Sequence, residues 1–306
     1  MNAIFLDSPV SDGQRREALY SGQLFVYSPT DTTRAFIQFA RQMIEQAFGG
    51  LDPVTAQYHL PVEEYAAILS RLKPAFIHHP QSKEFLQAIL RERGCDPGKT
   101  YFDVPRLRSS TSDDYLTSGI AYAFHPHRDT WYSAPMCQLN WWLPVYEVEA
   151  GNVMAIHPHY FSRAVRNGSR EYNYQQWAAT SRKEAAQHIR KDTRKQPHPE
   201  EPVELEPQIC IVAPPGGLLV FSAAHLHSSV PNYSGKTRFS IDFRTVHLED
   251  LRDRKGARNI DSECTGTTAG DYLQVESLEH LPEEVVRLYL DGTAQDLDSG
   301  EGRGGI

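Results

Sequence analysis

The strongest constraint on the fold is a series of short β-rich runs that begins near residue 118. The runs span 118–124, 136–145, 152–157, 203–212, 217–223 and 237–247. Several short strands without helices between them favour an antiparallel sandwich or barrel. A polar stretch at 171–199, with a helix expected over 174–190, interrupts the series, and we expect it to be an insertion over the β core.

The first hundred residues are predicted to be mostly helical. Apolar residues recur with a helical period over 31–48, and two more helical segments follow at 61–72 and 82–93. After the last β-rich run, turns lead to a short helix at 282–289 and a polar, Gly-rich tail at 298–306 that we expect to be frayed.

Composition excludes several classes of protein. Of the 306 residues, 40% are apolar and 23% are charged, as in soluble globular proteins. The apolar stretches 209–213 and 218–221 are too short to cross a bilayer, and residues 1–4 do not open a signal peptide, so we expect a cytoplasmic protein without a membrane partner. The net charge of −8 argues against nucleic-acid binding. Four cysteines lack the spacing of a zinc or disulfide motif: Cys95, Cys137, Cys210 and Cys264.

Histidines are paired along the chain. Six of the 13 histidines form three His-x-His pairs, namely His125/His127, His157/His159 and His225/His227. Residues two apart in a strand share a face, and histidine is the commonest metal ligand. The pairs therefore predict a metal site, without saying which histidines take part.

The first pair is followed by a carboxylate. His127-x-Asp129 places an imidazole and a carboxylate on the same side of an extended segment, and one more histidine would complete a three-ligand face. Two histidines and one carboxylate leave three adjacent coordination positions open, which is typical of non-haem Fe(II) oxygenases. A site of three histidines, His125, His127 and His227, is the alternative.

The predicted strand at 237–247 alternates between two faces. Its apolar face holds Phe239, Ile241 and Phe243. Its polar face holds Arg238, Ser240, Asp242 and Arg244. Charges on an inward face need partners. An anionic ligand would be a partner for Arg238, and Asp242 could pair with Arg244.

Residues 215–244 resemble the distal half of a known family. A Pro-Gly-Gly turn at 215–217, an apolar strand, His-x-Ser-x-Pro-Asn from His227 and Arg-x-Ser from Arg238 are similar to Fe(II)/2-oxoglutarate-dependent oxygenases, particularly the phytanoyl-CoA dioxygenase-like branch. His127-x-Asp129 matches the proximal motif of that family, and 151–159 is similar to its intervening segment. The resemblance covers about residues 118–247.

This resemblance implies a fold and a domain organisation. The fold is mainly β, with a double-stranded β-helix (jelly-roll, cupin-like) core, N-terminal helices and a helical insertion. We expect a single oxygenase domain over 1–306, with a mostly helical region at 1–100, a jelly-roll core at 101–250 and a C-terminal extension at 251–306. The insertion in the core is expected at about 160–200.

The resemblance also implies the metal and the reaction. His127, Asp129 and His227 would bind Fe(2+), and 2-oxoglutarate and O2 would be consumed with release of succinate and CO2. A small molecule would be hydroxylated or desaturated. Halogenation is not expected, because halogenating relatives replace the carboxylate ligand with a small residue and Asp129 is present.

Residues for the cosubstrate follow from the same resemblance. Arg238 and Ser240 would hold the far carboxylate of 2-oxoglutarate, since an arginine offers a bidentate fork that lysine lacks. In the run 136–145, Gln138 and Asn140 share a face with Trp142, and their amides could donate to the iron-chelating carboxylate. The alternative is that these amides satisfy buried backbone groups.

Five residues near the motifs are candidates for substrate contact: Trp131, Tyr132, Trp142, His157 and Arg244. Core packing, turn structure or an internal ion pair are the alternative roles. Two other functions are a cupin-type metal dioxygenase or isomerase that does not use 2-oxoglutarate, and a catalytically silent jelly-roll that binds a ligand or partner. Arg238 and Ser240 argue against the first, and the complete ligand set argues against the second.

Overall fold

Two β sheets form the core of the protein, and the computed structural model describes residues 3–121, 125–180 and 194–292 of it. The larger sheet contains β1 (Ile4–Leu6), β2 (Leu24–Tyr27), β3 (Thr100–Phe102), β4 (Arg106–Ser110), β5 (Leu139–Pro144), β8 (Leu218–Ser222), β10 (Arg238–His247) and β11 (Leu273–Gln274). The smaller sheet contains β6 (Met154–Ile156), β7 (Ile209–Cys210) and β9 (His227–Ser229). The spatial orders are β1-β2-β8-β5-β10-β3-β11, with β4 also paired to β10, and β7-β6-β9.

Strand β10 is the centre of the larger sheet. It pairs antiparallel with β5 on one side, and with β4 and then β3 on the other. Phe239, Ile241 and Phe243 are completely buried against the helical layer, so the predicted alternation is confirmed. The opposite face of β10 therefore turns its polar side chains towards the space between the sheets.

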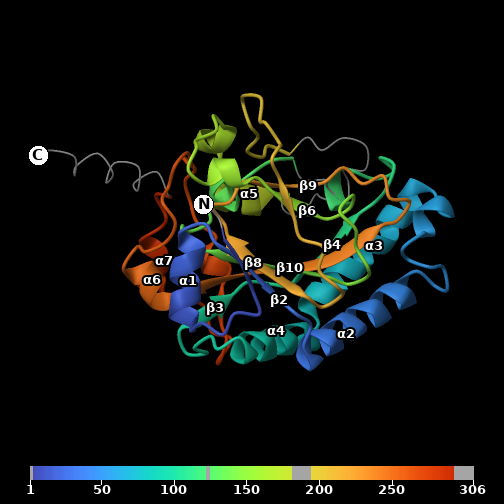
Figure 1. Ribbon diagram of the computed structural model, residues 1–306, viewed down its shortest axis with the longest axis horizontal. Coiled ribbons are helices and arrows are strands. Elements are labelled where there is room, and N and C mark those ends of the chain that lie inside the picture. The colour runs from blue at the N-terminus through green and yellow to red at the C-terminus, as the bar shows by residue number, and fades with distance from the viewer. Residues whose placement is uncertain (1–2, 122–124, 181–193, 293–306) are drawn as a thin grey trace, which may run out of the picture.

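Helices cover the outer face of the larger sheet, as Figure 1 shows for α2, α3 and α4. The helices are α1 (Asp12–Tyr20), α2 (Asp31–Ala47), α3 (Val62–His78), α4 (Pro80–Glu92), α5 (Tyr174–Thr180), α6 (Leu248–Arg252) and α7 (Glu283–Arg287). In α2 the side chain of Thr30 accepts from the backbone N–H of Thr33, while the Thr33 hydroxyl accepts from the backbone of Thr30. This reciprocal cap begins the helix, and Gly49 and Gly50, both with positive φ, follow its end.

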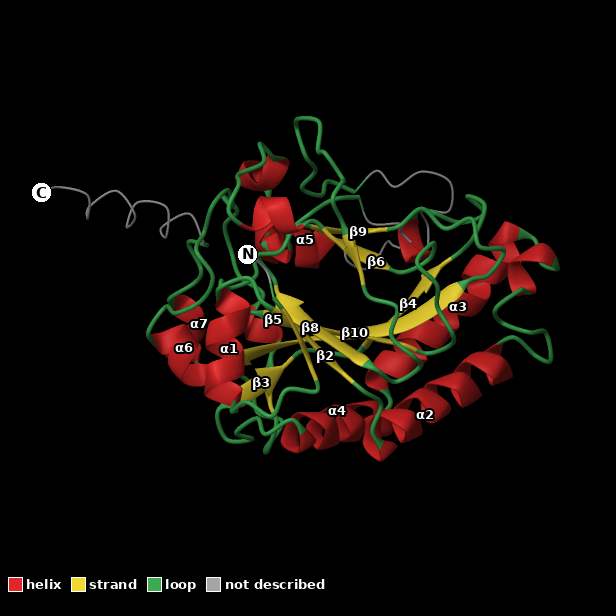
Figure 2. Cartoon of the chain, in the orientation of Figure 1, coloured by secondary structure: helices red, strands yellow, loops and turns green. Residues whose placement is uncertain are grey.

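The smaller sheet faces the other side of the larger sheet (Figure 2). Trp142, Leu219 and Phe221 of the larger sheet pack with Val153 and Ile156 in one apolar cluster between the sheets. Since one face of the larger sheet is covered by helices and the other by the smaller sheet, polar side chains between the sheets are removed from bulk water.

Most predicted elements are confirmed, with shifted ends. The helix predicted at 61–72 continues past Pro74 to His78, because Phe76 is buried against Phe36 and Phe39 of α2. The prediction of a strand at 118–124 is wrong for the described part of this run, since Gly119–Ala121 is a 3-10 helix. Residues 122–124 lie outside the described residues. The mostly helical region also contributes two strands, β1 and β2, to the larger sheet.

Parts of the insertion and the tail cannot be compared with the prediction. The helix expected over 174–190 is present as α5 up to Thr180, and 181–193 lie outside the described residues, as does the tail at 298–306. None of the helices in the described part of the chain is long and apolar enough to cross a membrane. The four cysteines are all free thiols.

The apolar face of β10 predicts a large effect of truncation. Phe239→Ala should lower the free energy of unfolding by about 3–5 kcal/mol, because it leaves a cavity beside Phe48 and Tyr146. Denaturant unfolding measures this change. The matched control is Tyr233→Ala, at a side chain that is 64% exposed, which should change stability by no more than about 0.5 kcal/mol. Equal small effects of both variants would contradict the burial of Phe239.

Candidate metal centre

Backbone pairing brings two of the predicted ligands together across 100 residues of sequence. The N–H of His127 donates to the carbonyl of His227 at 2.9 Å, and the N–H of His227 donates back at 2.9 Å. The two imidazole rings lie with their centroids 4.3 Å apart. This isolated antiparallel bridge holds the rings on one side, between the two sheets.

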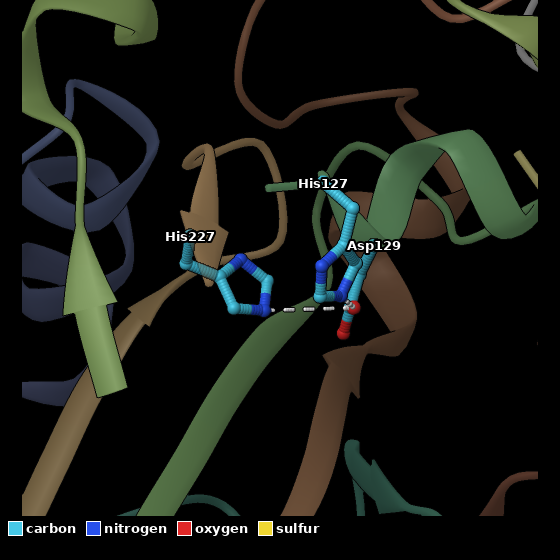
Figure 3. Close-up of side chains that lie close together, drawn as sticks. All are labelled: His127, Asp129 and His227. Carbon is cyan, nitrogen blue, oxygen red and sulfur yellow. Dashed lines mark ion pairs between the residues drawn. The ribbon is translucent and has the colours of Figure 1, made fainter. Parts of the chain in front are cut away.

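Asp129 completes a three-residue cluster, which Figure 3 shows. Arg128 has extended φ and ψ angles of −110° and 143°, so Asp129 lies on the same side as His127, and a 3-10 helix, Asp129–Tyr132, begins there. Asp129 Oδ1 is 3.4 Å from His127 Nε2 and 3.9 Å from His227 Nε2. One ligand atom from each of the three buried residues lies within 4.8 Å of the others.

The His-x-His partners orient the ligand rings. The Nδ1 of His127 contacts the backbone carbonyl of His125 at 2.9 Å, and the Nδ1 of His227 contacts that of His225 at 3.0 Å. A carbonyl can only accept, so Nδ1 carries the proton in both rings and the lone pair of Nε2 points at Asp129. Burial, together with His127, lowers the pKa of His227 to about 3. Both rings therefore have the tautomer, and His227 has the neutral charge, that a metal ligand needs.

The outer oxygen of Asp129 is held by two donors. Arg244 Nε donates to Oδ2 at 3.0 Å, and Gln138 Nε2 donates to the same oxygen at 3.2 Å. Burial favours the protonated form of Asp129, but the Arg244 guanidinium together with the neighbouring His127 and His227 outweighs it and holds the pKa of the carboxyl well below its usual range. Asp129 is therefore ionised, with Oδ1 left for a metal.

A first cavity of about 170 Å³ opens on one side of the cluster. It contains His127, Asp129 and Arg244, and much of its wall is aromatic. The aromatic residues are Tyr132, Tyr172, Tyr174, Trp177 and Tyr272. The sequence predicted only Tyr132 of these, because the others come from the insertion and the C-terminal extension, where no motif marks them.

A second cavity of about 70 Å³ lies on the other side and shares His127, Asp129 and Arg244 with the first. The remaining predicted residues that line it are Asn140, Trp142, His227, Arg238 and Ser240. The polar face of β10 and the inward face of β5 meet here, since Arg244 and Asn140 are directly opposite each other in the two strands.

Arg238 and Ser240 leave polar atoms unsatisfied in the second cavity. Nη1 of Arg238 donates to the carbonyl of Asn152 at 3.0 Å, but Nε of Arg238 has no hydrogen-bond partner. The hydroxyl of Ser240 also lacks a partner, although the residue is completely buried. Burial lowers the pKa of Arg238 to about 10, because Asp242 offsets only part of the desolvation. Unsatisfied buried donors beside a poorly compensated cation fit an anionic ligand.

Three predicted residues occupy other places than expected. Trp131 packs in a core cluster and its indole N–H donates to Asp261 at 2.8 Å, because the 3-10 helix at 129–132 turns it away from both cavities. His157 lines neither cavity, and its ring contacts the Ser228 hydroxyl and the Leu205 carbonyl. Gln138 lines the first cavity and contacts Asp129, rather than lining the cavity that contains Arg238.

The remaining alternatives also have defined positions. His125 Nε2 contacts the carbonyl of Pro197 at 3.0 Å, and the metal-ligand cluster within the described residues contains Asp129 rather than His125. Asp242 pairs chiefly with Arg108, whose Nε lies 2.6 Å from Oδ1, while its distance to Arg244 is 4.0 Å. No motif in the sequence marks Arg108, or Asp103, which accepts from the backbone N–H of Arg244 at 2.8 Å.

No protein-family model matches this sequence. No curated protein matches it either. Similar solved structures include EvdO2 from Micromonospora carbonacea var. aurantiaca, at 12% identity over 78% of this chain and 92% of EvdO2, with a TM-score of 0.46. EvdO2 complexed with 2-oxoglutarate has the same identity and TM-score, over 78% and 91% of the two chains.

A further similar structure is the epimerase SnoN in complex with Fe3+, alpha ketoglutarate and nogalamycin RO. Its identity is 12% over 77% of this chain and 85% of SnoN, with a TM-score of 0.38. At these TM-scores the similarities establish neither a shared fold nor a shared function.

The ion pair of Asp242 predicts an acid-sensitive contribution to stability. Burial disfavours its charge, but Arg108 and Arg244 lower the pKa of Asp242 below that of an unfolded aspartate. A depressed pKa stabilises the folded state above the unfolded pKa of about 3.9, and this contribution is lost as the pH falls through that value towards the folded pKa.

Denaturant unfolding of the metal-free protein between pH 7 and pH 3 tests this linkage. The free energy of unfolding of Asp242→Asn should fall less steeply with acid than that of the wild type. Asp31→Asn, at an exposed carboxylate on α2, should leave the wild-type slope unchanged. Parallel curves for Asp242→Asn and the wild type would contradict the assignment.

Proposed function

We propose that this protein is a non-haem Fe(II)- and 2-oxoglutarate-dependent oxygenase. The larger and smaller sheets would be the two halves of a double-stranded β-helix of the phytanoyl-CoA dioxygenase-like type. One observation carries the proposal: a buried His-Asp-His cluster lies beside a cavity in which Arg238 Nε and the Ser240 hydroxyl have no partners.

The donor set suits ferrous iron. Nε2 of His127, Nε2 of His227 and Oδ1 of Asp129 would be the ligands, and two imidazoles with one carboxylate leave three adjacent positions for other ligands. No thiolate belongs to the cluster. The carbonyls of His125 and His225 and the donors to Asp129 Oδ2 would fix the three ligands before the metal binds.

The second cavity suits 2-oxoglutarate. Arg238 and Ser240 would bind the carboxylate far from the metal, and Asn140 would donate near the metal end. When bound, iron and 2-oxoglutarate supply the activation of O2 that oxidises a C–H bond, with release of succinate and CO2. Trp142, which lies under the Arg238 guanidinium at 6.0 Å, would keep water from that ion pair.

The first cavity would position a small-molecule substrate. Its aromatic wall gives large rigid surfaces for an apolar body, and it reaches Asp129 and His127 directly. Which C–H bond is oxidised depends on that position, since the chain contributes orientation and exclusion of water. Hydroxylation is the outcome we favour, with desaturation as the alternative for the same site. A cytoplasmic location stays a prediction from the sequence.

Two other functions fit the site less well. A cupin-type dioxygenase or isomerase without 2-oxoglutarate would use the same metal face but would leave the donors of Arg238 and Ser240 unsatisfied. A silent binding protein would have no need of three converging buried ligands with their supporting hydrogen bonds.

Anaerobic addition of Fe(II) and 2-oxoglutarate to metal-free protein should produce the visible charge-transfer band of the chelate. Asp129→Ala should lower the affinity for iron at least about a hundredfold and abolish succinate formation, because it removes a metal ligand. Loss of a residue that only hydrogen-bonds to a ligand already lowers metal affinity about 10- to 100-fold. Asp31→Ala, at an exposed carboxylate, is the matched control. If the wild type gives no band, and Asp129→Ala changes neither property, the proposed function is wrong.

Arg238→Ala separates cosubstrate binding from metal binding. It should raise the concentration of 2-oxoglutarate required for half-maximal band formation at least about tenfold, since a charge-assisted hydrogen bond is lost. Iron affinity without 2-oxoglutarate should stay within about twofold, because this side chain is not a ligand. Arg34→Ala, at an exposed arginine of α2, should behave as the wild type. If Arg238→Ala needs the same 2-oxoglutarate concentration as the wild type, Arg244 rather than Arg238 would bind the far carboxylate.

A further inference from the structure

The amide of Gln138 joins the two cavities through a chain of buried hydrogen bonds. Its Nε2 lies 3.2 Å from Asp129 Oδ2 and 2.9 Å from Asn140 Oδ1. Its Oε1 accepts from the hydroxyl of Tyr272 at 2.6 Å. All four side chains are buried, so none of these bonds can be exchanged freely for a bond to water.

Chemistry fixes the direction of every bond in this chain. An ionised carboxylate can only accept, so Gln138 must turn its NH2 group towards Asp129. The second proton of that NH2 group then points at Asn140, whose Oδ1 accepts it. The carbonyl of Gln138 is left on the opposite side and needs a donor, which the phenol of Tyr272 supplies.

The direction of the chain determines what Asn140 offers to the second cavity. Because Oδ1 of Asn140 accepts from Gln138, Nδ2 of Asn140 can donate elsewhere, and it makes no hydrogen bond to any of the described residues. An asparagine turned the other way would direct its carbonyl dipole at an anionic ligand. The same residue would then repel the ligand that it should bind.

We propose that Tyr272 and Gln138 are positioning residues that set the orientation of the Asn140 amide, so that Asn140 presents an N–H donor to 2-oxoglutarate. This inference rests on the proposed function and extends it to two residues that do not line the Arg238 cavity. Tyr272 lies in the wall of the first cavity, and its ring packs with Cys137, Leu251 and Tyr289. The C-terminal extension thereby controls a donor on the far side of the metal ligands.

Tyr272→Phe removes the phenol donor and keeps the ring. Loss of that donor leaves the buried carbonyl of Gln138 unsatisfied, so the Gln138 amide is held only from the Asp129 side and no longer fixes the position of the Asn140 amide. In an anaerobic titration of the Fe(II) protein, the dissociation constant of 2-oxoglutarate should rise about fivefold to thirtyfold. The maximum of the charge-transfer band should also shift, and Fe(II) affinity in the absence of 2-oxoglutarate should stay within about threefold of the wild-type value.

Tyr289→Phe is the matched control for packing. Tyr289 belongs to the same apolar cluster, and its hydroxyl donates to the carbonyl of Leu251 at 2.8 Å, away from the metal ligands. It should leave the dissociation constant of 2-oxoglutarate and the band unchanged. Gln138→Met, which keeps the length of the side chain and removes both functional ends, should weaken 2-oxoglutarate binding at least as much as Tyr272→Phe.

A double-mutant cycle with Asn140→Leu tests whether Tyr272 acts through Asn140. If Tyr272 acts through Asn140, Tyr272→Phe should raise the dissociation constant of 2-oxoglutarate less than twofold in the Asn140→Leu background, because the donor that Tyr272 helps to orient is already absent. The proposed role of Tyr272 is wrong if the wild type binds 2-oxoglutarate and Tyr272→Phe leaves the dissociation constant unchanged. It is also wrong if the effects of the two substitutions on that constant multiply. Absence of a 2-oxoglutarate band in the wild type would instead reject the proposed function itself.

Discussion

The ionised carboxylate of Asp129 is the constraint on which the centre of this structure depends. A buried charge is costly unless it is paired and hydrogen-bonded. Arg244 and Gln138 donate to its Oδ2, and the lone pairs of two imidazoles converge on its Oδ1. A divalent cation between Oδ1 and the two Nε2 atoms would be the remaining partner. The arrangement that makes ionised Asp129 energetically costly to bury without a metal therefore makes it a strong metal ligand.

This requirement explains why β10 carries charge between the sheets. Arg244 must lie on the inward face to reach Asp129, and the period of two then brings Asp242, Ser240 and Arg238 onto the same face. Arg108 from the neighbouring strand β4 compensates Asp242. Arg238 is the member of the row whose Nε stays unsatisfied, and it is the one we assign to an anionic ligand.

The sequence predicted those parts of the site that follow from local periodicity. The ligands of His127-x-Asp129 share a side because Arg128 is extended, and the alternation of β10 follows from its sequence. Tyr272 and Asp103 were missed, because each reaches the site through tertiary contacts of a segment without a motif. Trp131 was misplaced because a 3-10 helix begins one residue after the extended segment. Gln138 was expected to donate to the iron-chelating carboxylate, and its contact with Asp129 was not foreseen, because that contact is set by the tertiary approach of two segments.

The most direct test of the account is a crystal structure of the protein prepared anaerobically with Fe(II) and 2-oxoglutarate, with anomalous scattering recorded at the iron edge. We expect an anomalous peak bound by Nε2 of His127, Nε2 of His227 and Oδ1 of Asp129. The density for 2-oxoglutarate should run from that peak to Arg238 and Ser240. An anomalous peak on other residues, or 2-oxoglutarate on the Tyr272 side of Asp129, would contradict the account.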